Sequence, residues 1–284
     1  MIVVAGGSGF VGSHFVSLLK ASRRPYVCIS RPLLGDSQSL QKQLEGAHTL
    51  VHILGKTNGT DEALKQSNVE ITKNLVKAAQ AAGVKRLIYV SSVAAIRRHG
   101  LYGQTKFEAE EIIGASGIPY LIFRPAYIFG RGDRQNTEMM IRTLKQFPVI
   151  PLLGGGDFKL QPVYVEDVTR LLFQALDSSD LNKVYTVAGS RQISLKDMLL
   201  ILSKELRVRR LLIPVPLKPV QMAVRVYASV VKNSKLPVKQ ILELNKHEAF
   251  DISETQRDFG FSPVTFQVGV QKMFLKKETT SCAA

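Results

Sequence analysis

Apolar and polar residues alternate along the first 125 residues in blocks of strand and helix length. Continuous apolar runs suited to buried strands lie at 2–5, 25–30, 49–55, 86–92 and 119–125. Between them, apolar residues recur at helical spacing in 10–19, 68–83 and 105–117, and glycines close the last two segments. Strands that alternate with helices of this length form a parallel sheet covered on both faces. The pattern predicts an α/β fold with a doubly wound parallel sheet.

Glycines are concentrated directly after the first apolar run, in the sequence GGSGFVG. Glycine at a strand-to-helix junction permits a tight turn and lets a ligand approach the backbone, and the N–H groups at the helix start can bind a phosphate. This context predicts a Rossmann-type dinucleotide site. We place its contacts at Gly6, Ser8, Gly9, Phe10, Val11 and Gly12.

The alternation loosens beyond Gly130, which indicates a change of domain. We expect an NAD(P)-binding domain at 1–130, a returning strand near 184–189, and a smaller substrate lobe formed mainly by 131–284. The lobe includes a helix that begins at SLKD, with Ser194 as its cap and Asp197 three residues on. We also assign the segment FDISETQRDFGF to this lobe.

The end of the second strand indicates which dinucleotide the site prefers. An acidic residue usually binds the ribose 2′-hydroxyl there, whereas an arginine accommodates a 2′-phosphate. This chain has Ser30 and Arg31, with no acidic residue before Asp36. The sequence therefore favours NADP(H) over NAD(H), and a merely solvated Arg31 remains the alternative.

A tyrosine and a lysine stand one helical turn apart, at Tyr102 and Lys106, after a strand that ends in YVSS. A lysine ammonium beneath a tyrosine lowers the pKa of the phenol and prepares it for proton transfer. Ser92, at the end of the strand, could bond to the same substrate oxygen. An ordinary amphipathic helix start gives the same tyrosine–lysine spacing, so both interpretations stay open.

Five motifs in this order resemble the NAD-dependent epimerase/dehydratase branch of the short-chain dehydrogenases/reductases: GGSGFVG, YVSS, YGQTK, RPAYIFGRGD and QPVYVEDV. The resemblance implies hydride transfer at a carbonyl or carbinol carbon, by a reductase or an epimerase, with Ser92, Tyr102 and Lys106 as the catalytic triad. It also implies that Asn68 supports the active site and that Pro125 and Ile128 border the nicotinamide. We add Leu54 and Gly55 to the cofactor contacts.

The second half of the chain is most similar to an atypical group within that branch, through FPVIPLLGGGDF, LLIPVPL and RDFGFSP. The group contains the nucleotide-binding accessory subunit of respiratory complex I and its bacterial relatives. Similarity to this group implies an alternative function: a non-catalytic NADPH-binding subunit of a larger assembly. The intact YGQTK motif favours retained chemistry instead.

Two segments depart from the family pattern. The chain between Arg31 and Thr49 is short, as if a helix and part of the third strand were trimmed, although Asp36 stands where the resemblance implies an adenine contact. The linker before Tyr102 is also short and carries three basic residues that could bind an anionic substrate, Arg97, Arg98 and His99. A solvated basic loop is the simpler interpretation. The short linker argues against typical recognition of nucleotide sugars. The substrate is nevertheless left open between a nucleotide sugar, another anionic compound and a lipid-linked compound.

The composition limits the partners. A net charge of +15 favours anionic ones: phosphate-bearing ligands, acidic lipid or nucleic acid. No nucleic-acid reader motif is recognised and aromatic residues make up only 7%, so we expect no nucleic acid. The basic, apolar stretch 207–239 suits a membrane surface or the core of the lobe.

The cysteines and histidines give no metal site, because the two cysteines are isolated and no histidine pair has ligand spacing. The chain has only two cysteines and no apolar run of membrane-spanning length. We therefore expect a cytoplasmic protein, either soluble or peripheral to a membrane. A homo-oligomer is left open.

Overall fold

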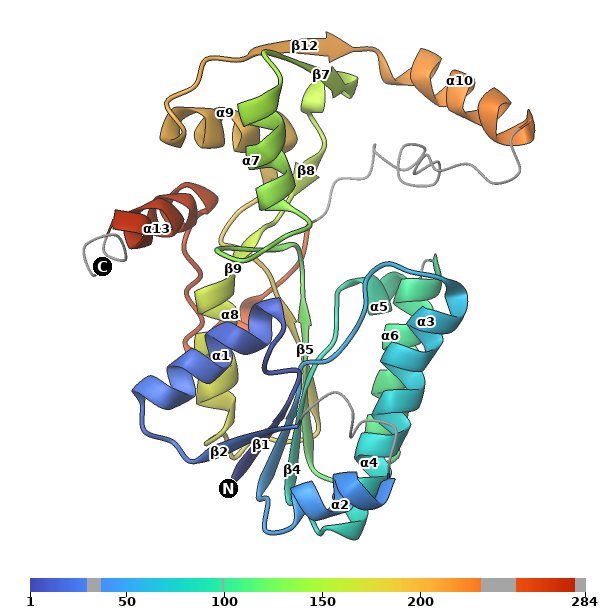
Figure 1. Cartoon of the computed structure of the whole chain (residues 1–284), viewed down its shortest axis with the longest axis vertical. Helices are drawn as coiled ribbons and strands as arrows, with labels where there is room; N and C mark the ends of the chain where they lie inside the picture. The colour runs from blue at the N-terminus through green and yellow to red at the C-terminus, as the bar shows by residue number, and fades with distance from the viewer. Residues whose placement is uncertain (30–36, 99, 231–248, 279–284) are drawn as a thin grey trace. The chain divides into compact units, whose positions relative to one another are not determined.

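The computed structural model describes residues 1–29, 37–98, 100–230 and 249–278 of the chain (Figure 1). Among them, a six-stranded sheet joins the strands in the order β10-β5-β4-β3-β1-β2, and all neighbouring strands run parallel. The strands are β1 (Ile2–Ala5), β2 (Tyr26–Ile29), β3 (Thr49–His52), β4 (Arg86–Val90), β5 (Tyr120–Pro125) and β10 (Lys183–Val187). The predicted doubly wound parallel sheet is confirmed. Its strand order reverses at β1, and ligands of such folds bind beyond the carboxyl ends of the strands at that point.

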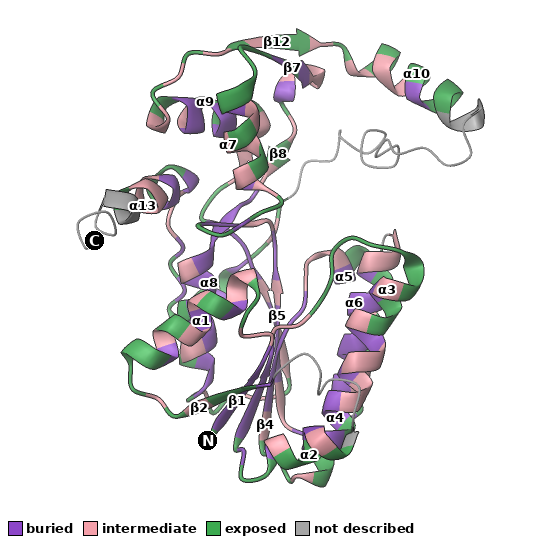
Figure 2. Cartoon of the chain, viewed as in Figure 1, coloured by how far each residue is buried: buried purple, intermediate pink, exposed green. Residues whose placement is uncertain are grey.

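Helices cover both faces of the sheet (Figure 1). On one face lie α1 (Phe10–Ala21) and α8 (Val165–Ala175), which pack against each other. On the other lie α2 (Ser37–Leu44), α4 (Ile71–Ala81) and α6 (Gly100–Gly114). This arrangement explains why β1, β3 and β4 are apolar on both sides, since their residues are nearly all buried (Figure 2). In β2, at the edge of the sheet, Val27 and Cys28 are exposed.

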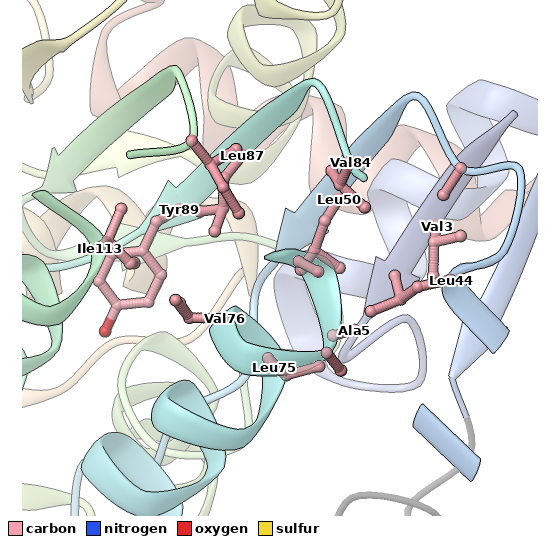
Figure 3. Packing of buried hydrophobic residues seen from close by; sticks show 14 of the residues in the cluster. Val3, Ala5, Leu44, Leu50, Leu75, Val76, Val84, Leu87, Tyr89 and Ile113 are labelled. Carbon is pink, nitrogen blue, oxygen red and sulfur yellow. The ribbon is translucent and has the colours of Figure 1, made fainter. Parts of the chain in front are cut away.

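The core on the second face shows how the helical spacing is used. Alternate strand residues such as Val3, Ala5 and Leu50 point to one side and meet Leu75 and Val76 of α4 (Figure 3). All five are at most 5% exposed. Because successive residues of a strand point to opposite faces, a continuous apolar strand supplies a core on each face.

Two segments differ from the expectations. The short stretch before β3 keeps an eight-residue helix, α2, so the helix is not trimmed away; Leu40 and Leu44 bury it against the sheet. The segment FDISETQRDFGF packs on the sheet rather than in the second lobe. It forms α12 (Ser253–Phe259), where the Thr255 hydroxyl donates to the carbonyl of Thr186 and Asp258 accepts from Tyr185 of β10.

The described chain divides into two compact units. The first holds the sheet and comprises 1–128, 165–188 and 251–263, while the second comprises 129–164, 189–250 and 264–284. In the second unit, Ser194 caps α9 (Leu195–Glu205) as predicted, because its hydroxyl accepts from the N–H of Asp197.

The other elements of the second unit are α7 (Thr137–Gln146), β7 (Val149–Leu153), β8 (Lys159–Leu160), β9 (Val163–Tyr164), β11 (Ile193–Ser194), β12 (Leu211–Val215), α10 (Leu217–Val230) and α13 (Phe266–Glu278).

The turn between β1 and α1 is built around one carbonyl group. Gly6 adopts a φ of +101°, which favours glycine, and its carbonyl accepts from the N–H of Gly9 at 3.0 Å. Gly12, in the first turn of α1, lies so close that a Cβ there would be 2.0 Å from the same oxygen. The glycines at 6 and 12 are therefore required by the turn itself.

We expect Gly12→Ala to lower the free energy of unfolding by about 2 kcal/mol or more, because the methyl group would force the turn apart. Gly9→Ala is the matched control: its Cβ meets only the Gly6 oxygen, at 3.4 Å, and the change should cost less than about 1 kcal/mol. Urea unfolding of the three proteins measures both values. Equal stability of the two variants would contradict this account of the turn.

Candidate cofactor and active site

The glycine turn offers exposed backbone at the start of a helix. Ser8 and Gly9 are exposed, and Phe10 and Val11, which begin α1, are half-buried. Gly9 precedes α1 without a side-chain cap, and the first turn contains no acidic residue. Backbone N–H groups at such a helix start attract a phosphate. The sequence-predicted contacts at this turn therefore fit a dinucleotide diphosphate.

The chain that follows β3 meets the glycine turn. A Cβ at Gly6 would lie 2.9 Å from the backbone nitrogen of Leu54, so these two loops touch. A Cβ at Gly55 would lie 3.2 Å from Oδ1 of Asn68 and 3.4 Å from Nζ of Lys106. The structure thus brings Leu54, Gly55 and Asn68 together with the predicted catalytic lysine.

Asn68 lies in a single π-helical turn (Gln66–Glu70) that follows α3 (Asp61–Lys65). Its side chain is fully buried and accepts from the N–H of Lys56 while it donates to the carbonyl of Lys56 and to Oγ1 of Thr105. Thr105 in turn donates to the carbonyl of Tyr102. Asn68 therefore ties the loop after β3 to α6 through Thr105.

His52 supports the same π-helical turn from the sheet. Nδ1 of His52 accepts from the N–H of Leu54, which leaves Nε2 as the donor to Oγ1 of Thr72 at 2.9 Å. The Thr72 hydroxyl then donates to the carbonyl of Asn68 at 2.7 Å. Burial and the nearby charge of Lys106 lower the pKa of His52 from 6.5 to about 3. His52 is thus a neutral structural histidine.

Ser92 and Tyr102 are in hydrogen-bond contact beyond the carboxyl end of β4. Ser92 lies between that strand and α5 (Ala94–Arg97), and its Oγ also accepts from the N–H of Ala94. Gly103 lets α6 approach α5, because a Cβ there would lie 2.5 Å from the carbonyl oxygen of Ala94. The close packing of these helices brings the tyrosine to the serine.

Lys106 is buried one turn further along α6. Its ammonium donates to the carbonyl of Val90 at 2.8 Å and lies 4.3 Å from the ring centre of Tyr89. Burial lowers the pKa of Lys106 to about 7, and the negative charge of Glu110 acts in the opposite direction. In an apolar environment, a lysine loses its proton more readily than in water.

The pKa of Tyr102 does not follow the sequence-based expectation. Burial raises it above its ordinary value of 10, and the hydrogen bond from Ser92 partly offsets this. We expected Lys106 to lower the pKa of the phenol, but its ammonium donates to the carbonyl of Val90 and lies over the ring of Tyr89. The phenol therefore holds its proton firmly.

A buried ion pair behind the lysine was not anticipated. Arg124 of β5 donates from Nε and from NH2 to the two carboxylate oxygens of Glu110, at 2.9 and 2.5 Å, and the Ser91 hydroxyl donates to the same carboxylate. Glu110 is only 5% exposed in its side chain. The signal in the sequence was an arginine inside an apolar strand and a glutamate four residues after Lys106.

The two predicted arginines of the linker before Tyr102, Arg97 and Arg98, are exposed. Arg98, with a φ of +48°, stacks on Phe107, with 3.5 Å between its guanidinium carbon and the ring centre. Pro125 ends β5 and its carbonyl accepts from Val93, while Ile128 is half-buried in β6 (Ile128–Phe129). Four predicted residues lie outside the described part of the chain: Ser30, Arg31, Asp36 and His99. Within the described residues, no cluster of histidine, cysteine or acidic side chains could hold a metal ion.

The low pKa of His52 makes stability depend on pH. The unfolded chain takes up a proton near pH 6.5, whereas the folded protein does so only near pH 3. The free energy of unfolding should therefore fall as the pH drops below 6.5, with a slope from this group that approaches about 1.4 kcal/mol per pH unit.

His52→Asn should remove the contribution of His52 to this slope. The free energy of unfolding of the variant should therefore change less between pH 6.5 and pH 5 than that of the unmodified protein. His14→Asn, a half-buried histidine of α1, is the control. Urea unfolding across this pH range gives the slopes. Parallel curves for the unmodified protein and His52→Asn would show that His52 is not the titrating group.

Known proteins share this fold and several of its sequence features. Residues 2–188 match the model of the NAD dependent epimerase/dehydratase family. The crystal structure of gox2253 superposes with a TM-score of 0.83 at 22% identity, covering 99% of this chain and 98% of that one. At this identity the superposition shows the fold alone.

Three curated relatives align at similar identity. A 3-beta-hydroxysteroid dehydrogenase of Mycolicibacterium neoaurum is 29% identical over 59% of this chain and 58% of its own length. A ceramide reductase of Caulobacter vibrioides is 30% identical, over 61% and 59%. Subunit 9 of the NADH dehydrogenase [ubiquinone] 1 alpha subcomplex of Arabidopsis thaliana is 28% identical, over 75% and 55%. The alignments thus span less than two thirds of each relative.

The family match covers 187 of 284 residues, from β1 through β10, and includes both the glycine turn and the cluster around Tyr102. The chain belongs to the NAD-dependent epimerase/dehydratase family.

Proposed function

We propose that this protein is an NAD(P)-dependent oxidoreductase that transfers hydride at a carbonyl or carbinol carbon, with Tyr102 as the proton donor or acceptor. One observation carries the proposal. Ser92 and Tyr102 share a hydrogen bond beyond the end of β4, with Lys106 buried one helical turn from the tyrosine. The glycine turn and the loop after β3 support a dinucleotide in the same unit.

The dinucleotide supplies the hydride chemistry when it is bound. The Ser92 hydroxyl holds and polarises the substrate oxygen, and the Tyr102 hydroxyl gives that oxygen a proton during reduction or takes one during oxidation. The raised pKa of Tyr102 keeps the phenol protonated, which suits reduction of a carbonyl. Burial lowers the pKa of Lys106 to about 7 and the carboxylate of Glu110 opposes this. An anionic dinucleotide would further favour the charged form of the lysine.

For the cofactor, we infer a preference for NADP(H). The support is the sequence after β2, where Ser30 and Arg31 stand in place of an acidic residue, and Arg31 would bind the 2′-phosphate. Asp36 would contact the adenine, while Pro125 and Ile128 would border the nicotinamide. NAD(H) is the alternative, because the family as a whole is described as NAD dependent.

For the substrate, we infer a ketone or secondary alcohol on an apolar framework. Relatives that act, by name, on a hydroxysteroid and on ceramide support this class. The segment between Ser92 and Tyr102 is only nine residues long and contains the short helix α5, which leaves little chain for enclosing a nucleotide sugar. Arg97 and Arg98 would bind an anionic group where the substrate carries one.

A second candidate function is a non-catalytic, NADPH-binding subunit of a respiratory assembly. The likeness to the complex I subunit covers 75% of this chain, more than the two enzymes do. The two candidates differ in one respect that can be measured: only the first requires the Tyr102 hydroxyl for a chemical step.

Tyr102→Phe should therefore lower turnover by about 100-fold or more, because the proton donor is lost, while the dissociation constant for NADPH changes less than about threefold. Tyr120→Phe, at the start of β5, is the matched control and should keep full activity. Turnover is followed by nicotinamide absorbance with 3β-hydroxysteroids, long-chain ketones, dihydroflavonols and UDP-glucose.

Equal turnover by Tyr102→Phe and the unmodified protein would overturn the role of the tyrosine. Tight NADPH binding without turnover of any compound in the panel would favour the second candidate.

A further inference from the structure

The second unit contains a two-stranded ribbon with apolar residues on both of its faces. β7 and β12 pair in parallel, with Leu211 opposite Val149 and Leu212 opposite Ile150. Ile150 and Leu152 point to one face and are buried. On the other face, Val149, Leu211 and Ile213 are 44%, 61% and 41% exposed. A strand that packs on one face only is expected to carry polar residues on the other.

The helix that follows the ribbon in the chain, α10, also exposes apolar residues. Met222 and Val226 stand one turn apart on α10 and are 69% and 61% exposed, whereas Val224 is buried. Figure 2 shows β12 and α10 coloured mainly as exposed. We call the residues Leu211, Ile213, Met222 and Val226 the β12–α10 surface.

Cations accompany these apolar side chains. Between Arg207 and Tyr227 the chain has five lysines and arginines and no aspartate or glutamate. One of them, Arg210, has a structural role, since its guanidinium donates to the carbonyls of Leu144 and Lys145. The other four are exposed: Arg207, Arg209, Lys218 and Arg225. Lys218 and Arg225 flank Met222 on α10 at helical spacing, four residues before and three after it.

We propose that the β12–α10 surface binds anionic lipid bilayers, with its apolar side chains at the boundary between headgroups and acyl chains and its cations among the headgroups. Apolar residues with interspersed lysine and arginine are the composition that such a surface requires. Among the described residues, no helix is both long and apolar enough to span a bilayer.

The charge distribution favours lipid over a second copy of the chain. In a two-fold symmetric dimer the same surface would face itself, and the four exposed cations would face the same four cations of the partner copy. Like charges brought together oppose association, whereas an anionic bilayer attracts each of them. Lys232 and Lys239, which the basic stretch also contains, lie outside the described residues.

Co-sedimentation with vesicles tests the proposal on the full chain. We expect binding to phosphatidylcholine vesicles with 30% phosphatidylserine that is at least about tenfold tighter than to phosphatidylcholine alone and weakens as salt is raised. The double variant Met222→Ser/Val226→Ser should reduce binding to the anionic vesicles by about tenfold or more. Leu200→Ser, 47% exposed on α9 in the same unit, is the apolar control and should bind unchanged.

A second pair of variants separates this surface from the general positive charge of the protein. Arg209→Gln/Arg225→Gln should weaken binding by about tenfold or more, because each cation near the lipid contributes about fivefold. Lys196→Gln/Lys204→Gln removes the same charge from exposed positions of α9 and should change binding less than about threefold. Circular dichroism and melting temperature check that every variant is folded.

Three results would overturn the proposal. These are no binding to anionic vesicles, equal losses for the two double charge variants, or unchanged binding of Met222→Ser/Val226→Ser. Sedimentation velocity tests whether the surface binds a second copy of the chain instead. If the unmodified protein is a dimer that does not bind vesicles, and Met222→Ser/Val226→Ser is a monomer, the surface is a dimer interface.

Discussion

The burial of one ammonium group, that of Lys106, constrains the whole site. A charged lysine inside a protein is costly unless polar groups surround it. Here the carbonyl of Val90, the ring of Tyr89 and the carboxylate of Glu110 provide that environment. Glu110 is fixed in turn by Arg124 and Ser91. These partners come from β4, α6 and β5, so the lysine links the sheet edge to the helix that carries Tyr102.

The Lys106 ammonium also lies next to the loop after β3, which in turn contacts the glycine turn of the proposed dinucleotide site. Gly55 approaches both Lys106 and Asn68, and Leu54 approaches Gly6 of the glycine turn. A Cβ at position 55 would make tight contacts with the side-chain ends of Asn68 and Lys106, so a larger residue there would have to displace them. His52 and Thr72 fix the π-helical turn that presents Asn68. Residues far apart in sequence thus form one connected site at the carboxyl edge of the sheet, around its switch point.

Local sequence signals predicted much of this. The strand from Ile2 to Ala5, the glycine turn and the cap at Ser194 follow from short-range chemistry, and the structure has each of them. The network behind Lys106 was missed because Glu110 and Arg124 stand on separate elements and only the fold brings them together. The raised pKa of Tyr102 was missed for a similar reason, since burial is a property of the packed structure. Likewise, α12 packs on the sheet through hydrogen bonds to β10, which no local sequence pattern predicts.

We infer that the cluster around Lys106 acts on a dinucleotide held by the glycine turn. The most direct measurement is a parallel fluorescence titration of the purified protein with NADPH and NADH, repeated with Lys106→Met. We expect saturable binding of NADPH, tighter than that of NADH, and at least about tenfold weaker binding by the variant, because the methionine removes a cation that would lie next to the dinucleotide. Failure of both dinucleotides to bind would contradict it, and so would unchanged affinity in Lys106→Met.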